Sequence, residues 1–90
     1  MARIKIPPQL GSLVEGRKHI DISASNIRDV FLTIDELFPM VRSQIFDANG
    51  KVRDFVGLFV EGVQIREISD ENQTVSEDGE ILIVIAVAGG

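Results

Sequence analysis

The last four residues have the pattern with the clearest chemical use. Val87 and Ala88 continue an apolar run, and Gly89 and Gly90 then present no side chains. Because glycine lacks Cβ, such an ending can pass through a narrow channel and adopt backbone angles that other residues avoid. Extended at about 3.3 Å per residue, the four residues reach roughly 13 Å from a folded body. The sequence therefore predicts that the carboxylate of Gly90 can enter the active site of another protein.

Side-chain chemistry elsewhere in the chain is sparse. The sequence has no cysteine, which removes thiolate ligands and cysteine nucleophiles, and its one histidine, His19, cannot build a histidine-rich metal site. Asp35 and Glu36 are adjacent on an expected helix, so they point in different directions and cannot share a site. A Walker-type phosphate loop is also absent. We therefore expect a protein that is not an enzyme and that binds no metal or cofactor of its own.

The charge distribution excludes several classes of partner. Nine basic and fourteen acidic residues give a net charge of −5, which argues against nucleic acid. Six acids and no base lie from Glu67 to Glu80 without the spacing of a calcium loop, so we expect a solvated acidic loop. No apolar run approaches the roughly 20 residues of a membrane span, and the N-terminus is not a secretory signal. We expect no membrane partner and a cytoplasmic location.

One amphipathic helix stands out in the hydrophobic pattern. Its apolar residues recur at helical spacing and form one stripe: Ile27, Val30, Phe31, Ile34, Leu37 and Phe38. This spacing predicts a helix over residues 26–37 that buries the stripe from Ile27 to Leu37 against a sheet. Ser25 is the expected N-cap, because its hydroxyl can accept from a free N–H of the first turn, and Pro39 marks the end of the helix. A further helical turn is expected over residues 40–46.

Five segments have the pattern of strands: residues 2–6, 19–22, 55–60, 63–65 and 81–87. The first two alternate apolar and polar residues, and we expect them to form an opening hairpin. The third and fourth are separated only by Glu61-Gly62, which fits a two-residue hairpin turn. The last is apolar at every position, which predicts a central strand with both faces covered and at least one parallel neighbour.

This order of elements predicts an α+β domain of the β-grasp type. The helix lies across one face of a five-stranded mixed sheet, and the last strand lies in the middle beside the first. A ferredoxin-like fold would need a second long helix near residues 67–80, where no apolar stripe exists. Ninety residues have room for one core. We expect the domain to cover residues 1–86 and a flexible diglycine tail to cover residues 87–90.

The third strand also predicts a contact surface. Alternate residues from Val56 to Val60 suit packing beneath the helix, which leaves Phe55, Gly57 and Phe59 turned outward near the final strand. Exposed aromatic residues flanked by polar groups mark protein contacts, so we expect these three residues at a partner interface. The alternative is that the two faces are reversed, or that a phenylalanine packs beneath the acidic loop.

Several segments together resemble the ubiquitin-like sulfur carriers, the family of the thiamin sulfur carrier and the small subunit of molybdopterin synthase. The matching segments are Ile4-Lys5-Ile6-Pro7, Leu37-Phe38-Pro39, the run from Phe46 to Val56, and Ala86-Val87-Ala88-Gly89-Gly90. The chain looks most like the branch that supplies sulfur for cysteine or for secondary metabolites, and the resemblance extends over essentially the whole chain. Three departures are visible: Gly57 where asparagine is frequent, Glu61-Gly62 in place of an asparagine-containing turn, and Ile85 and Ala86 in place of prolines.

The resemblance implies a carrier function. In that family an ATP-dependent activating enzyme adenylates the terminal glycine carboxylate, which is then converted to a thiocarboxylate, and the resemblance implies the same for Gly90. Val87, Ala88 and Gly89 would thread through the partner's active site. The implied partners are an E1-like adenylating and sulfur-transferring enzyme, which uses ATP and Mg²⁺, and a biosynthetic enzyme that accepts the sulfur.

Two other functions stay open. A ubiquitin-like modifier would share the activation step and join Gly90 to lysines of other proteins. A β-grasp interaction module with a fortuitous ending would use neither reaction. For a carrier, the acceptor pathway could make cysteine, thiamin, molybdopterin or a secondary metabolite.

Overall fold

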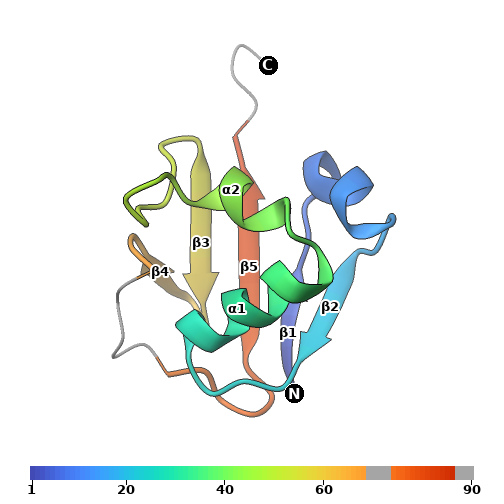
Figure 1. Cartoon of the computed structure of the whole chain (residues 1–90). Helices are drawn as coiled ribbons and strands as arrows, with labels where there is room; N and C mark the ends of the chain where they lie inside the picture. The colour runs from blue at the N-terminus through green and yellow to red at the C-terminus, as the bar shows by residue number, and fades with distance from the viewer. Residues whose placement is uncertain (69–73, 87–90) are drawn as a thin grey trace.

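Five strands form one mixed sheet that carries the helices on one face (Figure 1). The computed structural model describes residues 1–68 and 74–86. Its elements are β1 (Ala2–Lys5), the 3₁₀ helix η1 (Pro8–Val14), β2 (His19–Ile22), α1 (Ile27–Leu37), α2 (Val41–Ile45), β3 (Val56–Val60), β4 (Val63–Ile65) and β5 (Glu80–Ile85). The strand order is β2-β1-β5-β3-β4, which confirms the predicted α+β arrangement with one main helix. None of the helices in the described part of the chain is long and apolar enough to cross a membrane.

β5 lies at the centre of the sheet, as its apolar sequence predicts. It runs parallel to β1, with Ile81 opposite Ile4, and antiparallel to β3, with Ile83 opposite Leu58. Parallel neighbours need a long crossover, and the chain between β1 and β5 includes both helices and the other strands. The hairpins β1-β2 and β3-β4 complete the two edges of the sheet. The expected placement of the last strand beside the first is therefore confirmed.

The turn between β3 and β4 is the predicted two-residue hairpin. Glu61 and Gly62 have φ angles of 50° and 84°, and Val60 pairs directly with Val63. Positive φ at both central residues is what a type I′ turn requires, because its twist matches that of the flanking strands.

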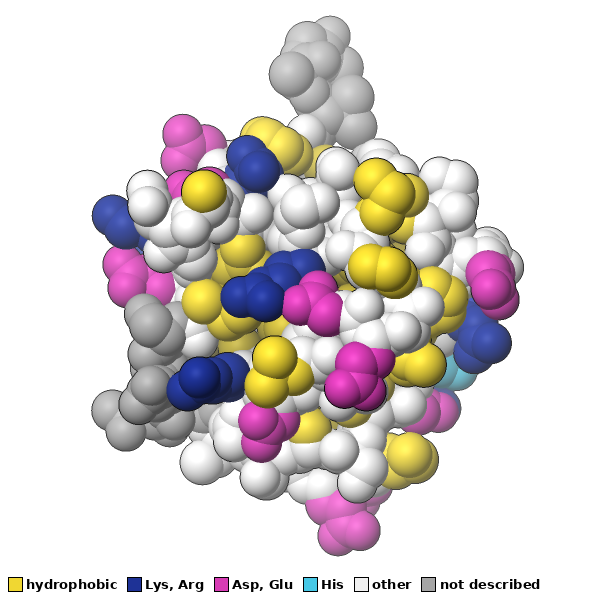
Figure 2. Space-filling model, viewed as in Figure 1, with side chains coloured by type: hydrophobic (Ala, Val, Ile, Leu, Met, Phe, Trp, Pro, Cys, Tyr) yellow, Lys and Arg dark blue, Asp and Glu magenta, His cyan; other side chains and the backbone are white. Residues whose placement is uncertain are grey.

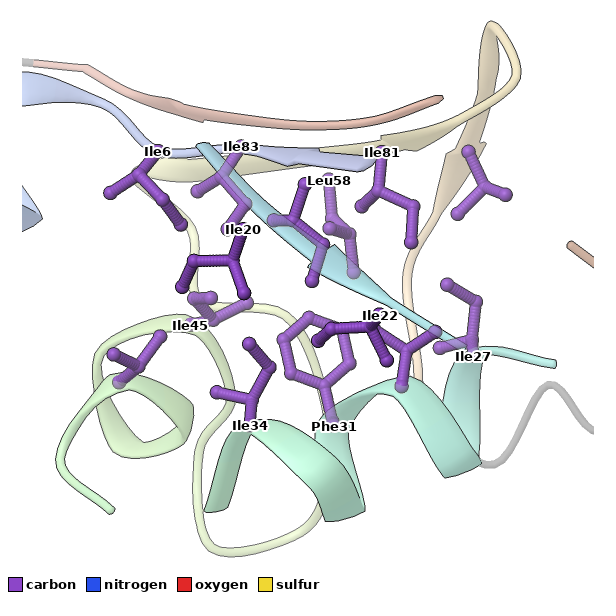
Figure 3. Close-up of a cluster of buried hydrophobic side chains, with 14 of the residues drawn as sticks. Ile6, Ile20, Ile22, Ile27, Phe31, Ile34, Ile45, Leu58, Ile81 and Ile83 are labelled. Atoms are coloured by element: carbon purple, nitrogen blue, oxygen red, sulfur yellow. The ribbon is translucent and has the colours of Figure 1, made fainter. Parts of the chain in front are cut away.

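The core fills the space between the sheet and the two α-helices. Figure 3 shows side chains from the sheet and from the helices that point toward one another: Ile20, Ile22, Leu58, Ile81, Ile83, Ile27, Phe31, Ile34 and Ile45. Phe31 is fully buried, and its ring meets the ring of Phe46 edge to face with centroids 5.0 Å apart. The predicted stripe therefore packs on the sheet over most of its length.

Leu37 is the exception, because the structure leaves 55% of it exposed. The helix ends at this residue, and the chain turns at Phe38, which is only partly buried. Val41 and Ile45 of α2 are fully buried, and Figure 3 shows Ile45 among the core side chains to which Ile34 also belongs. The prediction that Leu37 is buried is therefore wrong: α2, rather than the last turn of α1, continues the core at this end.

Asn26, not Ser25, caps the N-terminus of α1. Asn26 has an extended backbone, and its Oδ1 accepts a hydrogen bond of 2.9 Å from the backbone N–H of Asp29. The carbonyl of Ser25 accepts from the N–H of Val75, which fixes Ser25 one residue outside the capping position. The prediction of a Ser25 cap is wrong by one residue.

Replacement of Asn26 by alanine should lower the free energy of unfolding by about 1 kcal/mol, because it leaves a first-turn N–H without its side-chain acceptor. The measurement is urea denaturation followed by far-UV circular dichroism. Ser25→Ala is the matched control and should change stability by less than about 0.5 kcal/mol. A larger loss for Ser25→Ala than for Asn26→Ala would place the start of the helix one residue earlier.

Candidate functional site

The carboxyl end of β5 is where the described structure meets the predicted tail. Ile85 pairs with Val56, and the N–H of Ala86 donates to the carbonyl of Phe55 at 2.9 Å. These bonds hold Ala86 beside the start of β3, at the end of the sheet where α2 also lies (Figure 1). The predicted functional residues of the tail, Val87, Ala88, Gly89 and Gly90, lie outside the described residues.

The sheet face opposite α1, here called the outer face, is open to solvent in the described chain. Along β5, Ile81 and Ile83 are buried, whereas Leu82 and Val84 are 38% and 44% exposed. The prediction that both faces of the last strand are covered is therefore wrong, because the helices pack on one face only. A solvated sheet face normally carries polar residues, so exposed aliphatic residues on the central strand are unusual.

Five neighbouring residues form what we call the outer-face patch: Phe55, Gly57, Phe59, Leu82 and Val84. Phe59 lies opposite Leu82 and Gly57 opposite Val84, so the side chains of Phe59, Leu82 and Val84 lie on one face, next to the bare backbone of Gly57. Phe55, just before β3, is 48% exposed. Gly57 and Phe59, two of the three residues expected at a partner interface, therefore lie together on the outer face, and Phe55 is exposed in the turn that leads into β3. The alternative of reversed faces is excluded, because alternate residues from Val56 to Val60 are buried.

Leu82 and Val84 were not among the expected interface residues. The apolar run over residues 81–87 predicts a strand covered on both faces. Such a run does not show which of its residues face the helices and which face solvent. The available signal was the count of helical stripes, since one long amphipathic helix can cover only one face of a sheet.

The ring of Phe59 lies close over Gly57. A Cβ atom built on Gly57 would be 2.9 Å from Cε2 of Phe59 and 3.6 Å from its Cζ. Residues two apart on a strand point to the same face, so the ring leans back along β3. The bare backbone of Gly57 and the Phe59 ring together make the middle of the outer-face patch.

Charged residues border the patch on the β1 and β2 side and pair with one another. Arg3 donates from Nε to Asp21 at 3.0 Å, and Lys5 lies 3.3 Å from Glu80. The hydrogen bond from Arg3 holds the pKa of the Asp21 carboxyl below its ordinary value. The polar border is therefore balanced in charge and does not by itself favour an acidic or a basic partner.

The helix side of the molecule also exposes apolar residues, among them Leu32 and Leu37 of α1 and Met40 just before α2. Figure 2 shows hydrophobic side chains there interspersed with charged side chains of both signs. Asp35 accepts from Nη1 of Arg42 at 2.9 Å, whereas its neighbour Glu36 is exposed, so the two carboxylates do not share a site, as predicted. His19 is exposed on the edge strand β2. Within residues 1–68 and 74–86, no cluster of three metal-ligating side chains occurs.

Polar side chains with hydrogen bonds inside the chain line a hollow beside α2. Its lining includes Arg53 and Asp47, and the Nε of Arg53 donates to the carbonyl of Ser43 at 2.9 Å. Oδ1 of Asp47 accepts from the N–H groups of Lys51 and Asn49, which closes a turn over residues 47–50. These backbone hydrogen bonds lower the pKa of the Asp47 carboxyl. The polar groups here are used to hold the turn.

The acidic segment behaves as expected where it is described. Glu67, Glu77, Asp78 and Glu80 are exposed, and Asp70 and Glu71 lie outside the described residues. Exposed carboxylates without a ligand cluster are typical of a solvated face.

Comparisons with known proteins identify structural similarity. No family model matches the sequence, and no curated protein matches it. A chain in the crystal structure of the Amycolatopsis orientalis BexX/CysO complex is 19% identical with a TM-score of 0.83, and 100% of each chain is covered. Mycobacterium tuberculosis CysO gives 19% identity and a TM-score of 0.83, with 97% of this chain and 100% of that chain covered. Haloferax volcanii SAMP1 gives 16% identity and a TM-score of 0.71, with 99% and 98% covered.

This chain has the β-grasp fold. The similarity covers nearly the full length of both chains, so it includes the central β5 and the helices that pack on one face. The fold implied by the resemblance in the sequence is therefore confirmed, and CysO and SAMP1 are among its structural neighbours.

Proposed function

We propose that this β-grasp protein is a sulfur carrier and that the carboxylate of Gly90 is its reactive group. The observation that carries the proposal is the position of Ala86. Backbone pairing holds it at the end of the central strand, and Val87-Ala88-Gly89-Gly90 follows it directly in the sequence. A partner can thus hold the rigid sheet and receive the four residues that follow in its active site.

The chemistry takes place in two steps on the Gly90 carboxylate. One carboxylate oxygen attacks the α-phosphorus of ATP, pyrophosphate leaves, and a mixed anhydride with AMP forms. A sulfide-type donor then attacks the carbonyl carbon, AMP leaves with the original oxygen, and a thiocarboxylate remains. The carboxylate is a poor electrophile before the first step and has a good leaving group after it. This chain supplies the carboxylate and the docking surface, and the partner supplies the catalytic groups.

The outer-face patch is the proposed docking site for the activating enzyme. Its aromatic and aliphatic residues adjoin Phe55, whose carbonyl binds the N–H of Ala86. An enzyme that accepts the four residues after Ala86 therefore meets this face first. Apolar residues in the centre with paired charges at the border are the usual arrangement of a protein interface.

Two partners belong to the proposal. The first is an E1-like adenylating enzyme that uses ATP and Mg²⁺, and the second is a biosynthetic enzyme that accepts the sulfur. The solved complex of A. orientalis contains CysO with BexX, and by analogy it supports a second protein that binds this chain. In this proposal the carrier, the adenylating enzyme and the sulfur-accepting enzyme interact in the cytoplasm.

A protein modifier is the second candidate function. The observation that favours it is the similarity to the small archaeal modifier protein 1 of Methanosarcina acetivorans, with 20% identity and a TM-score of 0.73 over 99% of this chain and 95% of that chain. In this case a lysine amine, rather than sulfide, attacks the activated carbonyl of Gly90.

The test is an activation assay with intact-mass measurement. The protein is incubated with an E1-like adenylating enzyme from the same organism, ATP, Mg²⁺ and sulfide. A carrier gains the mass difference between one sulfur and one oxygen atom, and fragmentation confines the change to Gly90. Amide-linked conjugates without any thiocarboxylate would overturn the carrier and establish the modifier. Failure to form an adenylate would overturn both candidates.

Phe59→Ala should weaken binding to the activating enzyme by about 2 kcal/mol or more, because it removes the largest apolar group at the centre of the patch. The free energy of unfolding should change little, since the ring lies outside the core. Isothermal titration calorimetry measures the first effect and urea denaturation the second. Leu32→Ala is the matched control, since Leu32 is 49% exposed on α1, and its binding should be unchanged. A large stability loss with unchanged binding would place the docking site elsewhere.

A further inference from the structure

We infer that Gly57 is a positioning residue, which lets the Phe59 ring lie across β3 and so gives the outer-face patch the shape that the activating enzyme binds. This inference rests on the proposed function, because it concerns the same docking face. It adds the residue that acts through Phe59 without being a large contact group itself.

The contact distances leave no room for a side chain at residue 57. An ideal Cβ would lie 2.9 Å from Cε2, 3.6 Å from Cζ and 3.8 Å from Cδ2 of Phe59. A separation under 3.0 Å is essentially never seen for a real Cβ atom. Any other residue at position 57 therefore requires the ring to move.

The backbone does not explain this glycine. Among the glycines that the structure describes, those with positive φ are Gly16, Gly50 and Gly62, and Gly57 is not one of them. Gly57 is paired with Val84 within β3, where an ordinary side chain normally strengthens a strand. The position of the Phe59 ring is the feature that a glycine here makes possible.

The position of the Phe59 ring determines how far the middle of the outer-face patch projects from the sheet. Phe59 lies opposite Leu82, and Gly57 lies opposite Val84. With the ring leaning over Gly57, aromatic and aliphatic groups form one low surface that continues toward Phe55 and Ala86. A Cβ at residue 57 pushes the ring away from the backbone, so it stands up in the middle of that surface. The enzyme that receives the residues after Ala86 then meets a raised ring where the wild-type surface is low.

Folding should tolerate the alanine variant. The atoms that meet the new Cβ are at the far end of the Phe59 side chain, which can rotate, and the ring is not part of the core. Gly57→Ala therefore tests the shape of the patch without loss of the domain. Gly11→Ala is the matched control, because Gly11 lies in η1 without positive φ, and nothing lies within 4 Å of its Cβ position.

The first measurement is NMR of the free protein. In the wild type, the Hα protons of Gly57 should show nuclear Overhauser contacts to the Phe59 ring and an upfield ring-current shift. In Gly57→Ala, the contacts from residue 57 to the ring should weaken and the resonances of Val84 should shift. A wild-type spectrum without a contact between Gly57 and the ring would overturn the inference, whatever the partner does.

The second measurement is a double-mutant cycle on binding to the activating enzyme. Gly57→Ala should raise Kd about tenfold or more in the wild-type background, and by less than about twofold when Phe59 is already alanine. The rate of adenylate formation at saturating enzyme should be unchanged, because docking and not chemistry is altered. Gly11→Ala should match the wild type in both respects.

The outcomes separate this inference from the proposed function. If wild-type protein forms the adenylate and Gly57→Ala binds equally well, Gly57 has no positioning role and the proposed function stands. If Gly57→Ala weakens binding equally with and without the Phe59 ring, residue 57 acts directly and the inference is also wrong. If the wild type forms no adenylate with the enzyme, the proposed function fails and the inference fails with it.

Discussion

Removal of Gly90 should abolish thiocarboxylate formation completely while the domain remains folded. The reactive group in the proposed function is the carboxylate of that residue, so the shortened protein presents the carboxylate of Gly89 one residue short of the reacting position. One residue of extended chain is about 3.3 Å, which exceeds the tolerance of a reactive geometry. Intact-mass measurement after incubation with the activating enzyme, ATP, Mg²⁺ and sulfide should show no oxygen-to-sulfur exchange.

Gly89→Val provides a second variant of the same length as the wild type. Valine cannot follow the backbone path open to glycine, and its branched side chain fills a narrow channel. We expect the same loss of the mass change with an unchanged circular dichroism spectrum. Gly11→Ala is a glycine substitution away from the tail, and it should retain full activity.

The results distinguish the two candidate functions. If the adenylate forms but the products are only amide-linked conjugates to lysine, the protein is a modifier. Normal sulfur transfer by the shortened protein would show that Gly90 is not the reactive residue, and the carrier proposal would lose its site.

Phe31→Ala should lower the free energy of unfolding by about 3–5 kcal/mol, which combines lost burial with the cost of a cavity. Phe31 is fully buried in the stripe of α1, and its ring packs edge to face on Phe46 at 5.0 Å. Urea denaturation with a two-state fit measures the change, since a single domain of this size usually unfolds cooperatively.

Leu37→Ala is the informative control for Phe31→Ala. Helical periodicity puts both residues on one stripe, but Leu37 is 55% exposed in the structure. Its replacement should change stability by less than about 0.5 kcal/mol. A loss of under about 1 kcal/mol for Phe31→Ala, or an equally large loss for both variants, would show that the stripe is misassigned.

Hydrophobic periodicity in the sequence was sufficient to predict the main elements of the fold. The apolar stripe from Ile27 to Ile34 fits only a helix, and the alternation in residues 2–6 and 19–22 fits only strands. The structure has a helix and two strands in these places. The apolar run after Glu80 required a central position with a parallel neighbour, and the structure confirms both. Hydrophobic periodicity predicts these segments correctly because each element buries one face, so its apolar residues recur with the period of a helix or of a strand.

Errors occurred where contacts distant in sequence decide the outcome. Ser25 and Asn26 are both good capping residues, and the bond from Val75 to the carbonyl of Ser25 fixes which one caps. The pattern of residues 8–14 predicts no element, yet this segment forms η1 and buries Leu10 and Val14 against the rest of the core. Leu37 lies outside the core because α1 ends at this residue and the buried Val41 and Ile45 of α2 continue the core.

The sequence by itself determined the β-grasp arrangement and the two adjacent glycines at residues 89 and 90, because apolar spacing and the absence of side chains are local properties of the chain. The tertiary structure decided which residues make the outer-face patch. Leu82 and Val84 have the same apolar character as their buried neighbours, and their exposure follows from the helices' packing on one face of the sheet. The lean of the Phe59 ring over Gly57 also follows from the assembled sheet, since it depends on how side chains pack once the strands are paired.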